Sequence, residues 1–239
     1  MPPENVAAEK LARGIGPVPE ITTAQTAVHP KLEQVVTKHL SHGYRRPPVP
    51  WMREHFEAIY AAHRHQKIIL DTGCGRGHST RLLAQANPDH MVLGLDKSVQ
   101  RLNHLSAPLP ENARLYRVEL VDFWLLARAH DWVFDQVYLL YPNPWPKAMH
   151  LQRRWQGHAV FPSILATAQQ LCLRTNWQVY AEEFAIAATL AGRAAQAPEA
   201  LPLHAESTFM SAFERKYVLT GQPVYEVTVS GRVEGLAKS

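Results

Sequence analysis

The sequence predicts an α/β fold, with a mostly parallel sheet that ends in an antiparallel hairpin. Short apolar runs alternate with helical patterns from residue 67 to about residue 190, which is typical of a parallel sheet with right-handed crossovers. A glycine-rich turn follows the first apolar run directly, and two short β-patterned segments close the chain. The length of 239 residues suits a single α/β domain of ordinary size.

Two helices are expected before the sheet. Residues 1–27 are expected to form a flexible tail, and residues 28–65 a helical extension. Its first helix is predicted over residues 30–42, where Pro30 suits a first-turn position because no N–H is needed there. The second helix is predicted over residues 51–63 and leads into the first strand.

The glycine-rich turn predicts a ligand that lies against the backbone. The first strand is expected at residues 67–72, and a helix is expected to begin near Ser79. Between them lie Gly73, Gly75 and Gly77, which let a nucleotide approach the chain, while the helix N-terminus offers free N–H groups. The second strand, residues 91–96, ends in Asp96, and an acid at this distance can bind both hydroxyls of a ribose.

Asp71 narrows the class of ligand. This carboxylate lies at the tip of the first predicted strand, immediately before the glycines. It would repel a bound pyrophosphate and attract a cation such as the methionine amino group of S-adenosylmethionine. The pattern therefore favours a methyl donor over a dinucleotide.

The later elements follow the same alternation. Strands are predicted at residues 113–118 and 133–140, and Cys172 is placed in another strand. The alanine-rich residues 185–197 are expected to be helical as far as Pro198. Residues 217–219 and 224–229, separated by Thr-Gly-Gln-Pro, are predicted to form the closing hairpin, with a frayed tail at residues 231–239.

The most informative segment follows the strand at residues 133–140 and begins Pro-Asn-Pro-Trp-Pro-Lys at Pro142. Because proline fixes φ and lacks an N–H, three prolines in five residues exclude a helix or a strand. A rigid turn at the C-terminal end of a parallel strand lies where open α/β sheets bind ligands. It presents Asn143 and Trp145, followed by the cationic residues Lys147, His150, Arg153 and Arg154.

These motifs resemble the bacterial tRNA (guanine-N7)-methyltransferases over roughly residues 66–226. The family has Pro-Asp-Pro-Trp-Pro-Lys and a similar His/Arg run in place of this turn and its cations. Residues 175–177 (Thr-Asn-Trp) resemble its Thr-Asp-Trp segment, and residues 211–214 (Ser-Ala-Phe-Glu) its Thr-x-Phe-Glu segment. The resemblance implies a Rossmann-like, S-adenosylmethionine-dependent methyltransferase domain over residues 66–230, acting in the cytoplasm to form 7-methylguanosine in tRNA.

The resemblance also implies a role for each matching position. The donor site would contain Asp71 for the methionine end, the glycines of the turn, Asp96 for the ribose and Glu119 near the adenine amino group. Asn143 would lie where donor and base meet, as the catalytic position. The tRNA would be contacted by Lys147, His150, Arg153, Arg154, Asn176, Ser211 and Glu214.

Two acids of the family pattern are replaced here, by Asn143 and Asn176, and the usual Gly-Gly turn before the fifth strand is missing. Guanine N7 carries a lone pair and no proton, so its methylation needs alignment and water exclusion but no general base. An amide offers one acceptor and one donor, which is compatible with orienting a base but less suited to gripping guanine N1–H and its amino group.

Two alternatives stay open at this point. Asn-Pro followed by an aromatic residue is similar to the turn of methyltransferases that act on exocyclic amines, where the amide oxygen accepts an amine proton. The loss of both acids is also expected in a paralogue that binds donor or RNA without turnover. In that case the chain would bind its ligands but transfer no methyl group.

Composition excludes several other classes of protein. The formal charge of +4 is a mild excess, which suits a local basic patch better than a general nucleic-acid coat. Two cysteines predict neither a disulfide scaffold nor a four-ligand zinc site, and no metal is expected. No secretory signal or membrane span is expected. Monomer and homodimer both stay open.

Overall fold

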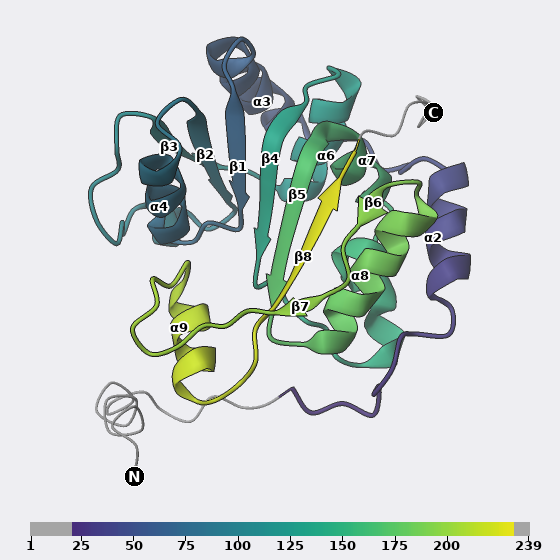
Figure 1. Cartoon of the computed structure of the whole chain (residues 1–239). Helices are drawn as coiled ribbons and strands as arrows, with labels where there is room; N and C mark the ends of the chain where they lie inside the picture. Colours follow the sequence, from purple (N-terminus) through teal and green to yellow (C-terminus); the bar gives the residue numbers. More distant parts are fainter. Residues whose placement is uncertain (1–20, 232–239) are drawn as a thin grey trace.

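The computed structural model describes residues 21–231 and confirms the α/β fold. Within these residues the strands form one eight-stranded sheet in the order β3-β2-β1-β4-β5-β8-β6, with β7 paired to β8 (Figure 1). The strands are β1 Ile68–Thr72, β2 Met91–Asp96, β3 Ala113–Arg117, β4 Phe134–Leu140, β5 Ala168–Thr175, β6 Ala194–Ala195, β7 Glu199–Ala200 and β8 Tyr225–Ser230.

Strands β1 to β5 are parallel, and β8 is antiparallel to β5. The strand order turns back between β1 and β4, which both pair directly in the centre of the sheet. All five residues of β1 are buried, because a central parallel strand is covered on both faces. The carboxyl ends of β1 and β4 therefore border the crevice in which a Rossmann-like sheet binds its ligand.

Helices cover the sheet and connect its strands. They are α2 Leu32–Ser41, α3 Pro50–His63, α4 His78–Ala86, α5 Val99–Leu102, α6 Leu120–Ala129, α7 Phe161–Thr167, α8 Gln178–Leu190 and α9 Ala212–Leu219, with 3₁₀ turns η1 Ala148–Arg153 and η2 Trp155–Gly157. The extension packs onto the later helices, with α2 against α8 and α3 against α6. Aromatic rings of Phe56, Phe123 and Trp132 join α3 and α6 in the core.

Residues 21–27 differ from the flexible tail expected there. Thr23 and Gln25 hydrogen-bond to residues of the turn after β4 and of α8, more than 120 positions later in the chain. Figure 1 shows this segment, in purple, passing below α8 before it rises to α2. The remainder of the expected tail, residues 1–20, and residues 232–239 lie outside the described residues.

Two sequence predictions about the last third of the chain are wrong in detail. Residues 217–219 lie in α9, so β8 pairs antiparallel with β5, β6 and β7 rather than with them. The helix forms because the Ser211 side chain accepts a hydrogen bond from the Glu214 N–H and caps it. The helix expected over residues 185–197 instead ends at Leu190, before a turn at Gly192 with φ of +79°.

The connection before the fifth strand, where the Gly-Gly turn is missing, is short. Helix α7 passes into β5 with no intervening residue. The buried Arg193 guanidinium donates hydrogen bonds to the carbonyl oxygens of Leu165, Ala168 and Gln169. It thereby satisfies polar groups that the abrupt change from helix to strand would leave unpaired.

Three further findings concern disulfides, metal sites and membrane-spanning helices. Cys74 and Cys172 are both free thiols. Between residues 21 and 231, no cluster of three or more His, Cys, Asp or Glu side chains could hold a metal ion. In the same part of the chain, every helix is too short or too polar to cross a membrane.

Candidate functional site

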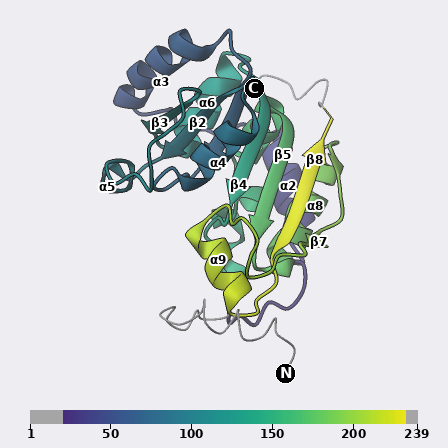
Figure 2. The same ribbon diagram turned by 60° about the vertical axis from the view of Figure 1, so that its left-hand side comes forward.

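A cavity of about 840 Å³ opens at the carboxyl ends of the central strands, where the order of the sheet turns back. Its walls come from the glycine turn after β1, the end of β2, the turn after β4 and the segment before α9. Figure 2 shows α9 below the ends of β4 and β5, so that this helix closes one side of the site. The chain thus gathers segments from residue 72 to residue 215 around one space.

The glycine turn has the backbone that its sequence predicted. Gly73, Gly75 and Gly77 all have positive φ, and the first two line the cavity. At Gly77, with φ of +74°, any larger residue would be strained, and its Cβ would lie 3.0 Å from a Leu115 side-chain carbon that would have to shift. The free N–H groups at the start of α4 follow directly.

Asp71 is fully buried beneath the turn and does not line the cavity itself. Its Oδ2 accepts hydrogen bonds of 2.6 Å from both Ser79 and Thr80, which attaches α4 to the end of β1. Burial raises the pKa of this carboxyl above its usual value. Its Oδ1 accepts no hydrogen bond from the described residues, so one buried acceptor remains for a cationic or N–H donor group.

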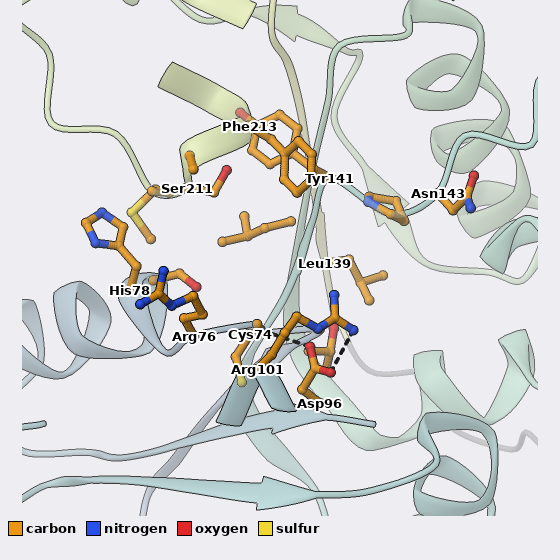
Figure 3. Close-up of a pocket in the computed structure, with 18 of the residues that line it drawn as sticks. Cys74, Arg76, His78, Asp96, Arg101, Leu139, Tyr141, Asn143, Ser211 and Phe213 are labelled. Atoms are coloured by element: carbon orange, nitrogen blue, oxygen red, sulfur yellow. Dashed lines mark hydrogen bonds and ion pairs between the residues drawn. The ribbon is translucent and has the colours of Figure 1, made fainter. Parts of the chain in front are cut away.

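Asp96 lies at the end of β2 and lines the cavity. One oxygen accepts from the Gly75 N–H at 2.9 Å, and the other accepts from the Ser98 N–H and the Arg101 guanidinium, each at 2.8 Å. Figure 3 shows Arg101 extending over this carboxylate. Sequence reasoning missed Arg101, although a basic residue five positions after the acid was a usable signal.

Glu119, the third predicted donor residue, precedes α6 and is exposed. It is not among the residues that line the cavity, whereas its neighbour Leu120 is. Its assignment to the adenine amino group therefore remains a prediction.

The turn after β4 holds two non-glycine residues in the left-handed region, Tyr141 at φ +52° and Trp145 at φ +45°. Such backbone strain persists only where the surroundings hold it, and it concentrates at functional sites. Asn143 lies between them, is exposed and lines the cavity. Among the described residues its amide oxygen accepts one long hydrogen bond, of 3.4 Å from the Trp145 N–H, so the amide remains available to a ligand.

The cations after the turn separate into exposed and buried groups. Arg153 is exposed, lines the cavity and lies 4.7 Å above the Trp145 ring. Lys147 and His150 lie outside the cavity lining, with Lys147 exposed and the His150 ring edge-on to the Trp145 ring. Partial burial, together with the charges of Arg153 and Lys147, lowers the pKa of His150.

The prediction that Arg154 contacts the tRNA is wrong in this structure. Its side chain is completely buried, and it donates two hydrogen bonds, of 2.8 and 2.6 Å, to the equally buried Glu183. Sequence spacing could not separate it from Arg153, because the two arginines are adjacent and only the tertiary fold buries one of them.

Glu214 also differs from its predicted role, since it is completely buried and its carboxylate is already occupied. One oxygen accepts from the Tyr141 hydroxyl at 2.6 Å and from Arg174 at 3.0 Å, and the other accepts from the Met210 N–H. Glu214 therefore ties α9 to the ends of β4 and β5 instead of facing a base. Desolvation and the neighbouring Glu214 charge raise the pKa of Tyr141.

Of the two remaining predicted substrate residues, one lines the cavity and the other does not. Ser211 lines the cavity at the start of α9, whereas Asn176 lies outside the lining and donates to Gln222 at 3.0 Å. Phe213 lines the cavity with 60% of its side chain exposed, and it stacks on Tyr217. Figure 3 shows Ser211 and Phe213 on one side of the space and Asp96 with Arg101 on the other.

Comparisons with known proteins agree with this arrangement. Residues 65–227 match a family model described as "Putative methyltransferase". The chain is 37% identical over 95 residues to a tRNA (guanine-N(7)-)-methyltransferase of Zymomonas mobilis, an alignment that covers 38% of this chain and 40% of that protein. An enzyme of the same name from Streptococcus thermophilus is 28% identical over 173 residues, covering 67% of this chain and 78% of the relative.

Solved structures show the same fold at low sequence identity. The antibiotic-resistance methyltransferase Kmr superposes with a TM-score of 0.52 at 19% identity, covering 78% of this chain and 96% of that one. A 16S rRNA adenine-N1 methyltransferase from Catenulisporales acidiphilia gives a TM-score of 0.53 at 18% identity, covering 74% of this chain and 91% of that one. The Rossmann-like methyltransferase fold is therefore established for this chain.

Proposed function

The chain belongs to the methyltransferase family whose model matches residues 65–227, and we propose that it transfers a methyl group from S-adenosylmethionine to N7 of a guanine in tRNA. The observation that carries the proposal is the single cavity that joins the glycine turn and Asp96 to Asn143 and the segment before α9. The relatives from Zymomonas and Streptococcus, which are named for this reaction, support the choice of substrate.

The residues on the donor side fit S-adenosylmethionine. The positive-φ glycines leave room for the donor beside the backbone, and the carboxylate of Asp96 lines the same space. Asp71 lies beneath the glycine turn, outside the cavity lining, and its Oδ1 is a buried acceptor that accepts no hydrogen bond from the described residues. When bound, S-adenosylmethionine supplies an electrophilic methyl group on a sulfonium. The chain's part is then to hold the donor and to exclude water around it.

The residues on the substrate side need only to orient a base. Because guanine N7 offers a free lone pair, the reaction requires in-line alignment and no proton acceptor. The Asn143 amide can donate to or accept from the guanine edge without carrying charge. The exposed ring of Phe213 lines the same cavity and provides an apolar surface for a base taken out of its stack.

The electrostatics of the cavity favour an anionic substrate. Five arginines line it, whereas Asp96 is the one acid among the lining residues that the structure describes. These arginines are Arg76, Arg81, Arg101, Arg153 and Arg215. A wall of this charge attracts the phosphates that flank a target nucleotide and contributes affinity that depends on salt rather than on sequence.

The test is methyl transfer from labelled S-adenosylmethionine to bulk tRNA that lacks 7-methylguanosine, with the product nucleoside identified by mass spectrometry. We expect enzyme-dependent 7-methylguanosine. Methylation of an exocyclic amine would replace the proposed target, and donor binding without any transfer would indicate a binding protein. An inactive sample that also fails to bind donor would contradict the donor site.

A further inference from the structure

The turn that carries Asn143 has little means of holding itself in place. Three of its residues are prolines without an N–H, and Trp145 has a strained backbone. Among the described residues, the one hydrogen bond within the turn is the long one that the Trp145 N–H donates to the Asn143 side-chain oxygen at 3.4 Å. The contacts that fix its conformation therefore come from other segments.

Three successive carbonyl oxygens of the turn accept hydrogen bonds from outside it. The Arg154 guanidinium donates to the Trp145 oxygen at 3.1 and 3.2 Å and to the Lys147 oxygen at 3.4 Å. The oxygen between them, on Pro146, accepts from the Thr23 hydroxyl at 2.5 Å. The N-terminal segment and Arg154 thus share the support of one short stretch of backbone.

The same segment completes the buried ion pair. The Gln25 side chain accepts from Arg154 at 2.9 Å and donates to Glu183 at 2.6 Å, so it bridges both members of the pair. The His29 N–H adds a bond of 3.0 Å to Glu183. Because the Arg154 and Glu183 side chains are both completely buried, few other partners can replace these bonds.

We propose that Thr23 and Gln25 are positioning residues for the methyl transfer, acting through the Arg154–Glu183 pair and the turn that carries Asn143. The proposal rests on the proposed function for its kinetic consequence. Residues 21–29 act as a strap across the turn. Together with Arg154, the strap holds the carbonyl groups of residues 145–147 in place. The position of these carbonyl groups in turn determines where Asn143 and the Arg153 side chain stacked on Trp145 lie in the cavity. Donor binding depends on the β1–β2 side of the cavity and is expected to be independent of the strap.

The sharpest test removes one hydroxyl. Thr23→Val keeps the shape of the side chain but loses the bond to the Pro146 oxygen and the bond of 3.0 Å that the hydroxyl accepts from the Gln25 N–H, whereas Thr23→Ser keeps the hydroxyl. Thr26→Val is the matched control, since Thr26 is an exposed threonine of the same segment. We expect Thr23→Val to lower kcat roughly 10-fold, within the ~100-fold that a 1 Å misplacement of reacting groups can cost. Donor Kd and melting temperature should stay unchanged, and Thr23→Ser should restore the rate.

A second readout does not depend on methyl transfer. Hydrogen exchange of the peptide covering residues 143–150 should speed up in Thr23→Val and in Gln25→Ala, and stay at the wild-type rate in Thr26→Val. If the wild-type protein methylates no tRNA, the proposed function fails while this exchange measurement still decides whether the strap holds the turn. Wild-type exchange in both Thr23→Val and Gln25→Ala would overturn the proposal, as would an unchanged kcat in an active enzyme.

Discussion

Individual side chains in this site have roles that depend on whether they can still reach a ligand. Asp96 and Glu214 are both carboxylates at the cavity's edge, yet one lines the space and the other is enclosed by Tyr141 and Arg174. Arg153 and Arg154 differ in the same way. Residue identity and spacing locate such groups, but only the packing of distant segments decides which of them a substrate can contact.

Replacing Asp96 by alanine tests the ribose assignment. The change removes a charged acceptor that would bind the ribose hydroxyls. Because a hydrogen bond to a charged group is worth about 1.5–3 kcal/mol, the donor Kd should rise by roughly 10- to 100-fold. Binding of tRNA in the absence of donor should change less. Calorimetric titration with S-adenosylmethionine measures the affinity for the donor, and filter binding measures the affinity for tRNA. Arg101→Ala is the control for the neighbouring cation. An equal loss of both affinities would contradict the assignment.

Replacing Asn143 by aspartate tests whether the amide only orients the base. A carboxylate would make stronger, charge-assisted hydrogen bonds to guanine N1–H and its amino group, so KM for tRNA should fall a few-fold. Because N7 has no proton to remove, kcat should change little and should not follow the ionisation of the new carboxyl. Steady-state rates of this variant and of the wild type between about pH 4 and 8, a range that begins at the ordinary Asp pKa of about 4, measure this. A kcat that rises with deprotonation would show that the residue acts as a base.

At the scale of elements, regular periodicity was predictable and local capping was not. The strands at residues 67–72 and 91–96 are buried apolar runs, and the structure places them within one residue of expectation. Residues 217–219 carry a β-like pattern, but the cap at Ser211 extends a helix over them. The structural role of Arg193 could not be predicted either, because its four carbonyl partners come together only through tertiary packing.

Arg193→Ala tests how the abrupt junction between α7 and β5 is maintained. The change would leave the buried carbonyl oxygens of Leu165 and Ala168, and the partly buried one of Gln169, without this donor, at about 1–3 kcal/mol for each unsatisfied buried group. We therefore expect the free energy of unfolding to fall by about 3 kcal/mol in urea denaturation. Arg53→Ala, on the exposed side of α3, should change it by less than about 0.5 kcal/mol. An equally small change in the free energy of unfolding for the two variants would mean that water replaces the guanidinium as hydrogen-bond donor.

At the scale of the whole molecule, a modest net charge of +4 is distributed unevenly. Five of its arginines line one cavity, and the described lining residues include a single acid, so the local field there is stronger than the total suggests. Composition alone predicted a local basic patch rather than a polycation, but not its position. The position follows from the fold, which brings α4, η1 and α9 to the same edge of the sheet.

The salt dependence of tRNA binding measures how many of these charges meet phosphate. Each phosphate neutralised releases counterions, so the logarithm of the affinity should fall linearly with the logarithm of the salt concentration. Arg153→Ala should weaken binding of all tRNAs alike and reduce the magnitude of the slope by about 1, because this exposed guanidinium is free to pair with the backbone. Arg45→Ala, an exposed arginine outside the cavity lining, is the matched comparison. If Arg153→Ala leaves the slope unchanged while lowering kcat, the arginine acts on Trp145 and the turn rather than on phosphate, and the basic wall of the cavity would then serve the reacting nucleotide more than the tRNA backbone.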